Sequence, residues 1–106
     1  MRMKCVVFNT TYHVNRAYVE RWLDFVKQHV KPRIEQHVAF SDYRICKVLI
    51  ADQPDDEAFA LQFSAENKSV IDHWLETEGH LLNAYMHKTF GENVLSFSVF
   101  MEEIAL

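Results

Sequence analysis

The sequence predicts an α+β domain with the element order β-α-β-β-α-β. Two observations support this fold class: apolar residues alternate along four segments, and they recur at helical spacing along two others. The length of 106 residues suits one hydrophobic core, so we expect a single domain over residues 1–106. The order is that of ferredoxin-like folds, with two helices on one face of a four-stranded antiparallel sheet and a strand order of 4-1-3-2.

The first half begins with a strand over residues 3–14. Its alternation places Val6, Phe8, Thr10 and Tyr12 on one face and Cys5, Val7, Asn9, Thr11 and His13 on the other. Asn15 is a helix cap, and the helix that follows extends to about residue 36. Its apolar positions are Val19, Trp22, Leu23, Val26, Val30 and Ile34. Pro32 has no N–H for the carbonyl of Gln28, so we expect a kink or a restart there.

The second half begins with a hairpin of two strands, residues 40–51 and 57–65, joined by an Asp- and Pro-containing turn. Ser69 and Asp72 resemble a capping box that starts the second helix. That helix extends to Phe90, is bent or loosened at Gly79, and ends at Gly91. Residues 94–104 form the last strand.

Two helices can cover only one face of such a sheet, so the second face needs another partner. We expect that face to carry Cys5, Val7, Asn9, Thr11 and His13 from the first strand, with Ser96, Ser98, Phe100 and Glu102 from the last. Such a mixed surface is typical of a sheet-to-sheet interface or a lined cavity, and we expect a two-fold homodimer. Which residues of the second and third strands face the helices stays open.

Composition and charge disfavour several classes of protein. The net charge is −4 and the Lys and Arg residues are scattered, which disfavours nucleic-acid binding. No apolar run reaches the length of a membrane span or a signal peptide, so we expect no membrane contact and a cytoplasmic location. Hydrolase, phosphate-loop, flavin and nicotinamide motifs are missing, and we expect no cofactor.

Metal binding is also not expected. Cys5 and Cys46 form no CxxC pair, and we expect both to be reduced core fillers on strands separated by another strand. His73, His80 and His87 recur every seven residues, about 10 Å apart along a helix, too far to share one ion. We expect a solvated or partner-facing stripe, and Glu76 with His80 would supply only two ligands.

Several segments resemble a known family, the domain-of-unknown-function family 4286 of roughly hundred-residue bacterial proteins. The resemblance is carried by FNTTYHV, ERWLDFVKQHV, SDYRICKVL, FALQF and SFSVFMEEI. Its most specific positions are Trp22, Leu23, His29, Tyr43 and Arg44. The family looks like a relative of the dimeric α+β barrels, which include small monooxygenases, isomerases and stress-response proteins. The resemblance implies a fold and a dimer but no known activity.

The chain also departs from that family's pattern. Pro32 lies three residues after His29 rather than two, and Gln36 and His37 replace a Thr-Gly pair. Ser98 stands where the family often has Arg, so an anion-binding role would not transfer to this position.

The candidate ligand-binding residues are His29, His13, Asn9, Trp22, Tyr43, Arg44 and Gln62. His29 lies at the edge of the apolar helix face and can reach a pocket between helix and sheet, or make a structural hydrogen bond. Asn9, Thr11 and His13 could form a polar cavity with Gln62, Ser64, Ser96 and Ser98, or a wet dimer interface. Arg44 could bind an anion or make a surface ion pair.

Two functions follow from these residues. One is a non-catalytic dimeric domain that binds a small molecule or a protein partner, including a regulatory subunit; the other is a cofactor-independent enzyme resembling a monooxygenase or isomerase. The enzyme hypothesis requires a cavity holding His29 or His13 beside a second polar group. Packed or fully solvated rings would favour the binding hypothesis, and fold alone cannot decide.

Overall fold

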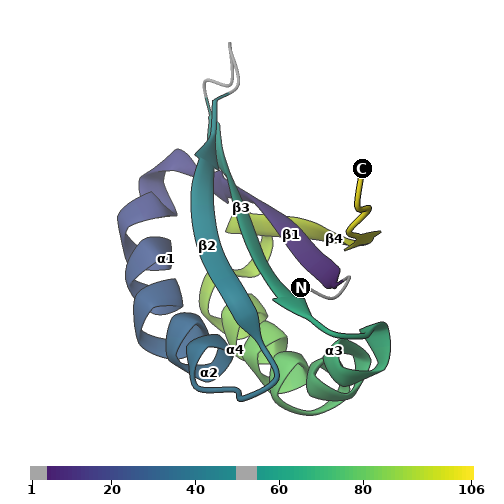
Figure 1. Cartoon of the computed structure of the whole chain (residues 1–106). Coiled ribbons are helices and arrows are strands. Elements are labelled where there is room, and N and C mark those ends of the chain that lie inside the picture. Colours follow the sequence, from purple (N-terminus) through teal and green to yellow (C-terminus); the bar gives the residue numbers. More distant parts are fainter. Residues whose placement is uncertain (1–4, 50–54) are drawn as a thin grey trace.

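The computed structural model describes residues 5–49 and 55–106 and confirms the predicted α+β fold. The four strands are β1 (Val6–Asn15), β2 (Ser41–Val48), β3 (Asp56–Ala65) and β4 (Val94–Glu102). They form one antiparallel sheet in the order β2-β3-β1-β4, which is the predicted order (Figure 1). The predicted strand start at residues 3 and 4, the end of the second strand at 50 and 51, and turn residues 52–54 lie outside the described residues.

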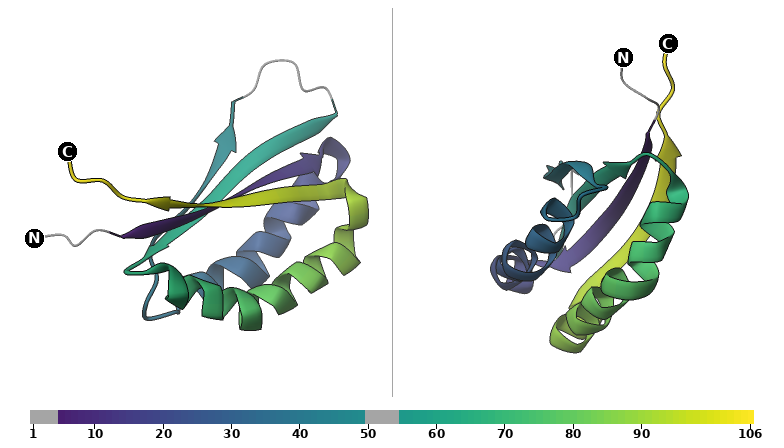
Figure 2. Two further views of the ribbon diagram at one scale, coloured as in Figure 1. Left: turned by 90° about the vertical axis from the view of Figure 1, so that its right-hand side faces the viewer. Right: turned by 60° about the horizontal axis from the view of Figure 1, so that its bottom comes forward.

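Two long helical segments pack on one face of the sheet and leave the other face bare (Figure 2). The first comprises a short 3-10 turn, η1 (Arg16–Tyr18), α1 (Val19–Phe25), the π-helical turn η2 (Val26–Val30) and α2 (Lys31–Glu35). The second comprises α3 (Lys68–Trp74), the π-helical turn η3 (Leu75–Gly79) and α4 (His80–Phe90), before the 3-10 turn η4 (Gly91–Asn93).

Helix starts and ends follow local chemistry. Asn15 is confirmed as a cap, since its Oδ1 accepts a hydrogen bond from the Ala17 N–H at 3.0 Å. Gly91 is confirmed as the end of the second helix, at a φ of +57° that favours glycine. The predicted Ser69 capping box is wrong. Asn67 is the cap, and its Oδ1 accepts from both the Val70 N–H and the Ser69 hydroxyl.

Each helical segment contains a π-helical turn close to the residue at which the sequence predicts an irregularity, Pro32 in the first and Gly79 in the second. Helical structure continues through Pro32, but the π turn η2 precedes it, with the Lys31 N–H bonded to the Val26 carbonyl five residues earlier. A π turn of this kind accommodates a residue that cannot donate to the usual carbonyl. The loosening predicted at Gly79 is confirmed, because the π turn η3 ends there.

The core fills the space between the sheet and the helices. Its aromatic and aliphatic members include Phe8, Tyr12, Trp22, Phe59, Phe63, Ile71 and Trp74. The face predicted for β1 is confirmed, since Phe8, Thr10, Tyr12 and Val14 are buried. The sequence left open which side of β2 and β3 faces the helices. In β3 this side carries Phe59, Leu61, Phe63 and Ala65, and in β2 it carries Tyr43 and Ile45.

The predicted orientation of the last strand is wrong. The register pairs Phe8 with Phe100, Thr10 with Ser98 and Tyr12 with Ser96, so the serines and Phe100 face the helices. Leu95, Phe97, Val99 and Met101 therefore lie on the bare face, which we call the open face. Paired residues of neighbouring strands share a face, so the β1 pairing fixes the parity, whatever the polarity of β4.

The prediction that both cysteines fill the core is wrong. Cys46 is exposed on the open side of the edge strand β2, where it pairs with Ala60, and Cys5 is partly buried. No disulfide joins them, and β3 lies between β2 and β1.

Replacing Trp22 by Ala should lower the free energy of unfolding by about 3–5 kcal/mol, because the fully buried indole packs on Tyr12 and Phe59, with ring centroids 5.0 and 5.2 Å away. Trp22→Phe is the control: its loss should be smaller, because the Trp22 indole nitrogen has no hydrogen-bond partner among the described residues. Urea unfolding measures both. A loss below about 1 kcal/mol for Trp22→Ala would contradict the core role.

Candidate binding site between the sheet and the helices

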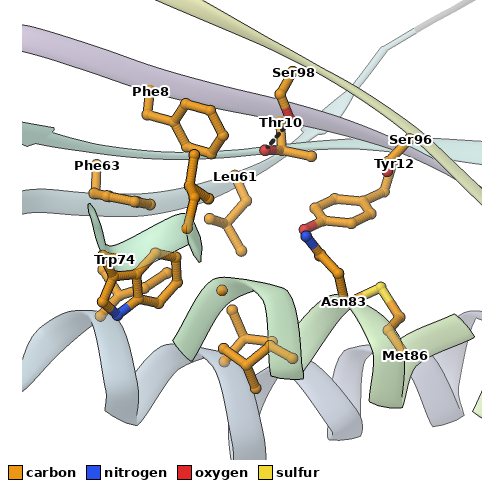
Figure 3. Close-up of a pocket in the computed structure, with 15 residues that line it drawn as sticks. Phe8, Thr10, Tyr12, Leu61, Phe63, Trp74, Asn83, Met86, Ser96 and Ser98 are labelled. Carbon is orange, nitrogen blue, oxygen red and sulfur yellow. Dashed lines mark hydrogen bonds between the residues drawn. The ribbon is translucent and has the colours of Figure 1, made fainter. Parts of the chain in front are cut away.

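A partly enclosed cavity of about 60 Å³ lies between the helix-facing side of the sheet and both helical segments (Figure 3). We call it the helix–sheet cavity. The sheet contributes Phe8, Thr10, Tyr12, Leu61, Phe63, Ser96 and Ser98. The helical segments contribute Val30, Ile34, Trp74, Leu75, Gly79, Leu82, Asn83 and Met86. A single water needs roughly 10–15 Å³ by this kind of measure, so the cavity can hold more than one small group.

Hydroxyl groups from two adjacent strands are placed inside this largely apolar space. The Thr10 Oγ1 and Ser98 Oγ atoms are hydrogen-bonded at 2.8 Å across the β1–β4 pair. Thr10 is buried although polar, and Tyr12 is buried beside it. Asn83, Ser96 and Ser98 are exposed, so they lie at the side where the cavity meets solvent. A few placed polar groups in an apolar cavity are typical of a small-molecule site.

Tyr12 places an ionisable phenol in the lining of the cavity. Burial raises the pKa of its phenol to about 12, an effect opposed by a hydrogen bond with Thr10 and supported by the nearby Tyr43. The phenol is therefore neutral at physiological pH and can both donate and accept a hydrogen bond. It can orient a ligand oxygen, but it is not poised as a base near neutral pH.

The two π turns contribute directly to the cavity wall. Val30 ends η2, and Leu75 and Gly79 begin and end η3, and all three line the cavity. Gly79 is buried, and a Cβ added there would lie 3.1 Å from both Trp74 Cζ3 and Leu75 Cδ2. Its bare Cα therefore lets the Trp74 ring pack closely against the helix.

The structure places His29 outside the helix–sheet cavity. Its ring packs against Phe25 and Tyr85, with centroids 4.9 and 5.1 Å away. It lines a separate groove formed by helical residues alone: Tyr18, Arg21, Asp24, Phe25, Gln28, Thr89 and Phe90. The predicted reach of His29 into a pocket between helix and sheet is therefore wrong.

Four of the predicted residues come together on or beside the open face. Gln62 Nε2 donates to Asn9 Oδ1 at 3.2 Å, and Asn9 Nδ2 donates to Thr11 Oγ1 at 3.3 Å. Gln62, Arg44 and Tyr43 line a shallow hollow with Val7, Asp42, Ser64 and Glu103. Burial and the nearby Glu35 raise the pKa of Tyr43. Ser96 and Ser98 do not join this group, because they lie on the other face of the sheet.

The last two predicted residues lie elsewhere. His13 is on the open face at the far end of β1, where its ring stacks on Phe97 with centroids 6.2 Å apart. Trp22 is buried in the core and does not line the helix–sheet cavity. The predicted residues are therefore spread over the open face, the core and an outer groove.

The sequence reasoning missed the residues that give the cavity its polarity. Thr10 and Tyr12 lie on the helix-facing side of β1, as predicted, but the sequence pattern indicates only a core position for them. A threonine alternating with aromatic residues on a buried strand face was the available signal. Asn83 carried no such signal, because an amide on a helix surface is ordinary.

The arrangement of β-α-β-β-α-β elements and the cavity beneath the sheet define a ferredoxin-like domain, and solved structures support this class. A provisionally assigned antibiotic biosynthesis monooxygenase from Bacillus cereus is 13% identical, with a TM-score of 0.62 and coverage of 96% of this chain and 95% of that one. A Bacteroides thetaiotaomicron protein of unknown function, described as a possible oxidoreductase, is 10% identical, with a TM-score of 0.71 and coverage of 96% and 100%.

A dimeric ferredoxin-like protein from an uncultured marine organism is 12% identical, with a TM-score of 0.55 and coverage of 99% of both chains. Identities this low show the fold alone. Residues 5–104 match the family described as "Domain of unknown function (DUF4286)", and the chain belongs to this family. No curated protein matches the chain.

Two further properties concern metals and membranes. Across residues 5–49 and 55–106, no group of three or more His, Cys, Asp or Glu side chains is placed to hold a metal ion. His73, His80 and His87 are all exposed. Within the same residues, no helix has the length and apolar character needed to cross a membrane.

Replacing Tyr12 by Phe should reduce the loss of stability at alkaline pH. The folded-state pKa of about 12 lies above the ordinary value of 10.0, so the folded protein holds this proton more tightly than the unfolded chain. That contribution is complete well below pH 10 and is lost as the pH rises toward 12, by about 1 kcal/mol at pH 11.

Urea unfolding of wild type and Tyr12→Phe at pH 8 and pH 11 measures this difference. Other titrating groups are shared by the two proteins, so the wild type should lose about 1 kcal/mol more between these pH values. Equal losses would show that the Tyr12 phenol ionises as readily when folded as when unfolded.

Proposed function

We propose that this chain acts as one ferredoxin-like domain that forms a homodimer and binds a small molecule in the helix–sheet cavity of each protomer. The observation that carries the binding function is the pair of buried hydroxyls of Thr10 and Tyr12, with the exposed Ser98 hydroxyl bonded to Thr10, on a cavity otherwise lined mainly by apolar side chains. Buried polar groups are costly unless they are satisfied, and a bound ligand can satisfy their remaining capacity.

The homodimer is supported by the open face. Leu95, Phe97, Val99 and Met101 of β4 are 61%, 57%, 43% and 43% exposed and form one apolar stripe. Beside it lie Val7, Asn9, Thr11 and His13 of β1, and further across are the polar Gln62 and Arg44. A stripe of this kind favours a protein partner, and a second copy meets it through a two-fold, self-complementary contact.

A second candidate function is a cofactor-independent enzyme using the same cavity. The monooxygenase and oxidoreductase descriptions of two structural neighbours, together with the cavity phenol of Tyr12, support it. Binding without catalysis is favoured, because neither His29 nor His13 lines the cavity and Tyr12 is no base near neutral pH.

Replacing Leu95 by Glu should weaken the dimer without unfolding the protomer, because a charge placed in an apolar interface must be desolvated. Leu81→Glu is the matched control, since Leu81 is similarly exposed at 63% but lies on α4, away from the open face. Sedimentation velocity over a concentration series should show a dimer for wild type and Leu81→Glu, and a monomer for Leu95→Glu. A monomeric wild type at high concentration would contradict the assembly.

A fragment screen by thermal shift tests the cavity. At least one fragment should raise the melting temperature of wild type, and this shift should disappear in Asn83→Phe, where a ring fills the cavity mouth. Ala84→Phe is the matched control, because Ala84 is exposed on the same helix and does not line the cavity. His29→Ala should also keep the shift. A wild type that no fragment stabilises, or shifts that persist in Asn83→Phe, would contradict the proposed site.

A further inference from the structure

Within residues 5–49 and 55–106, the lining of the helix–sheet cavity has no group that is charged at neutral pH. The fifteen lining residues from this part of the chain include no Asp, Glu, Lys, Arg or His, and the phenol has a pKa of about 12. A charged ligand group would lose its hydration on entry and find no opposite charge in the lining. The chemistry of the lining therefore favours an uncharged ligand.

The two ends of the cavity differ in polarity (Figure 3). Tyr12, Asn83 and Ser96 lie together at one end, and the side chains of Tyr12 and Asn83 point toward one another there. Phe63 and Trp74 lie at the other end, with Phe8 above them. Thr10 and Ser98 lie between and are already bonded to each other, and the Tyr12 phenol also bonds with Thr10. A phenol can both donate and accept, so Tyr12 keeps capacity for a second hydrogen bond beside the exposed Asn83 amide.

The indole of Trp74 is held so that it shows only carbon to the cavity. Its Nε1–H donates to Glu78 Oε2 at 2.9 Å, and Glu78 does not line the cavity. An indole has a single N–H donor, so none remains for a ligand at this end. The ring is further fixed by Phe63 and Phe40, at centroid distances of 5.6 and 5.5 Å, and by the missing side chain of Gly79.

We infer that the cavity takes an uncharged molecule with one hydrogen-bonding oxygen, held between Tyr12 and Asn83, and an apolar body that ends against Trp74. This inference rests on the proposed binding function and specifies its ligand class. Gly79 is then a residue that determines ligand size, because a side chain there would crowd Trp74 and Leu75, which both line the cavity.

Three probes of matched shape test the class: 4-methylphenol, toluene and 4-methylbenzoate, each titrated into wild-type protein with protein-observed NMR. We expect 4-methylphenol to bind at least tenfold more tightly than 4-methylbenzoate and more tightly than toluene. In Tyr12→Phe, the advantage of 4-methylphenol over toluene should fall by about two- to tenfold, the value of one hydrogen bond. Asn83→Ala tests the same end of the cavity at an exposed helix position, independently of core packing at Tyr12.

A second arm tests the orientation. Gly79→Ala should weaken 4-methylphenol more than phenol, because the added methyl crowds the end where the ligand's methyl group lies. Equal weakening of both would overturn the role of Gly79.

The outcomes separate the two proposals. If no probe binds and the fragment screen is also negative, the binding function itself fails. If 4-methylbenzoate binds as tightly as 4-methylphenol, or if both Tyr12→Phe and Asn83→Ala leave the phenol's advantage unchanged, the cavity still binds ligands but the inferred ligand class is overturned.

Discussion

Two helices can bury only one face of a four-stranded sheet, and the rest of this structure depends on that imbalance. Strand residues alternate between the faces, so each strand contributes one set of side chains to the core and the other to the open face. The buried set comprises the aromatic core, in which the ring of Phe63 contacts the rings of both Phe8 and Trp74. The exposed set must either meet solvent or be covered by another molecule.

Features encoded by local chemistry were predictable from the sequence. The alternation of β1 needed only its own residues, because its helix-facing side is much more apolar than its other side. Asn15 and Gly91 were likewise recognisable, since a side-chain cap and a positive φ are properties of single positions. The strand order followed from the element order, because few ways of connecting such elements are compatible with right-handed crossovers.

Features that depend on register or on long-range packing were not predictable in the same way. The more apolar side of β4, with Leu95, Phe97, Val99 and Met101, is the open side, so hydrophobicity alone indicated the wrong side as the core side. Its orientation is set by pairing with β1, which brings Phe100 beside Phe8 with ring centroids 4.9 Å apart. The assumption that the more apolar side faces the helices failed, because the open face of this sheet is itself apolar along β4.

The position of His29 relative to the cavity was not predictable for a related reason. A helical projection placed His29 at the edge of the apolar face, but it could not show which neighbour the ring would meet. The structure puts Tyr85 of the second helical segment beside it, so the partly buried ring lies in a groove between the helical segments and away from the sheet. The helical spacing of His29 correctly indicated a partly buried position, but it could not show whether the ring lines the helix–sheet cavity. Polar residues hidden within the core pattern, Thr10 and Tyr12, were the better indicators of a site.

The proposed assembly and the proposed binding site meet at β4. This strand lies at the edge of the sheet and pairs only with β1, so less backbone hydrogen bonding holds it than holds the inner strands. Ser98 lines the cavity and bonds to Thr10, while its neighbours Phe97 and Val99 lie on the open face. A partner copy covering the open face would restrain the strand that forms one wall of the cavity.

A ligand held at the polar end of the cavity, where Ser96 of β4 lies beside Tyr12 and Asn83, would restrain the same strand from the other side. Dimerisation and ligand binding would therefore each reduce the conformational entropy of β4. If the first event has already ordered this strand, the second event has a smaller entropy cost. Thermodynamic linkage makes any such coupling reciprocal, so a ligand that favours the dimer is bound more tightly by the dimer. The alternation of β4, with apolar residues on one side and serines on the other, connects the two surfaces without requiring contact between ligand and partner.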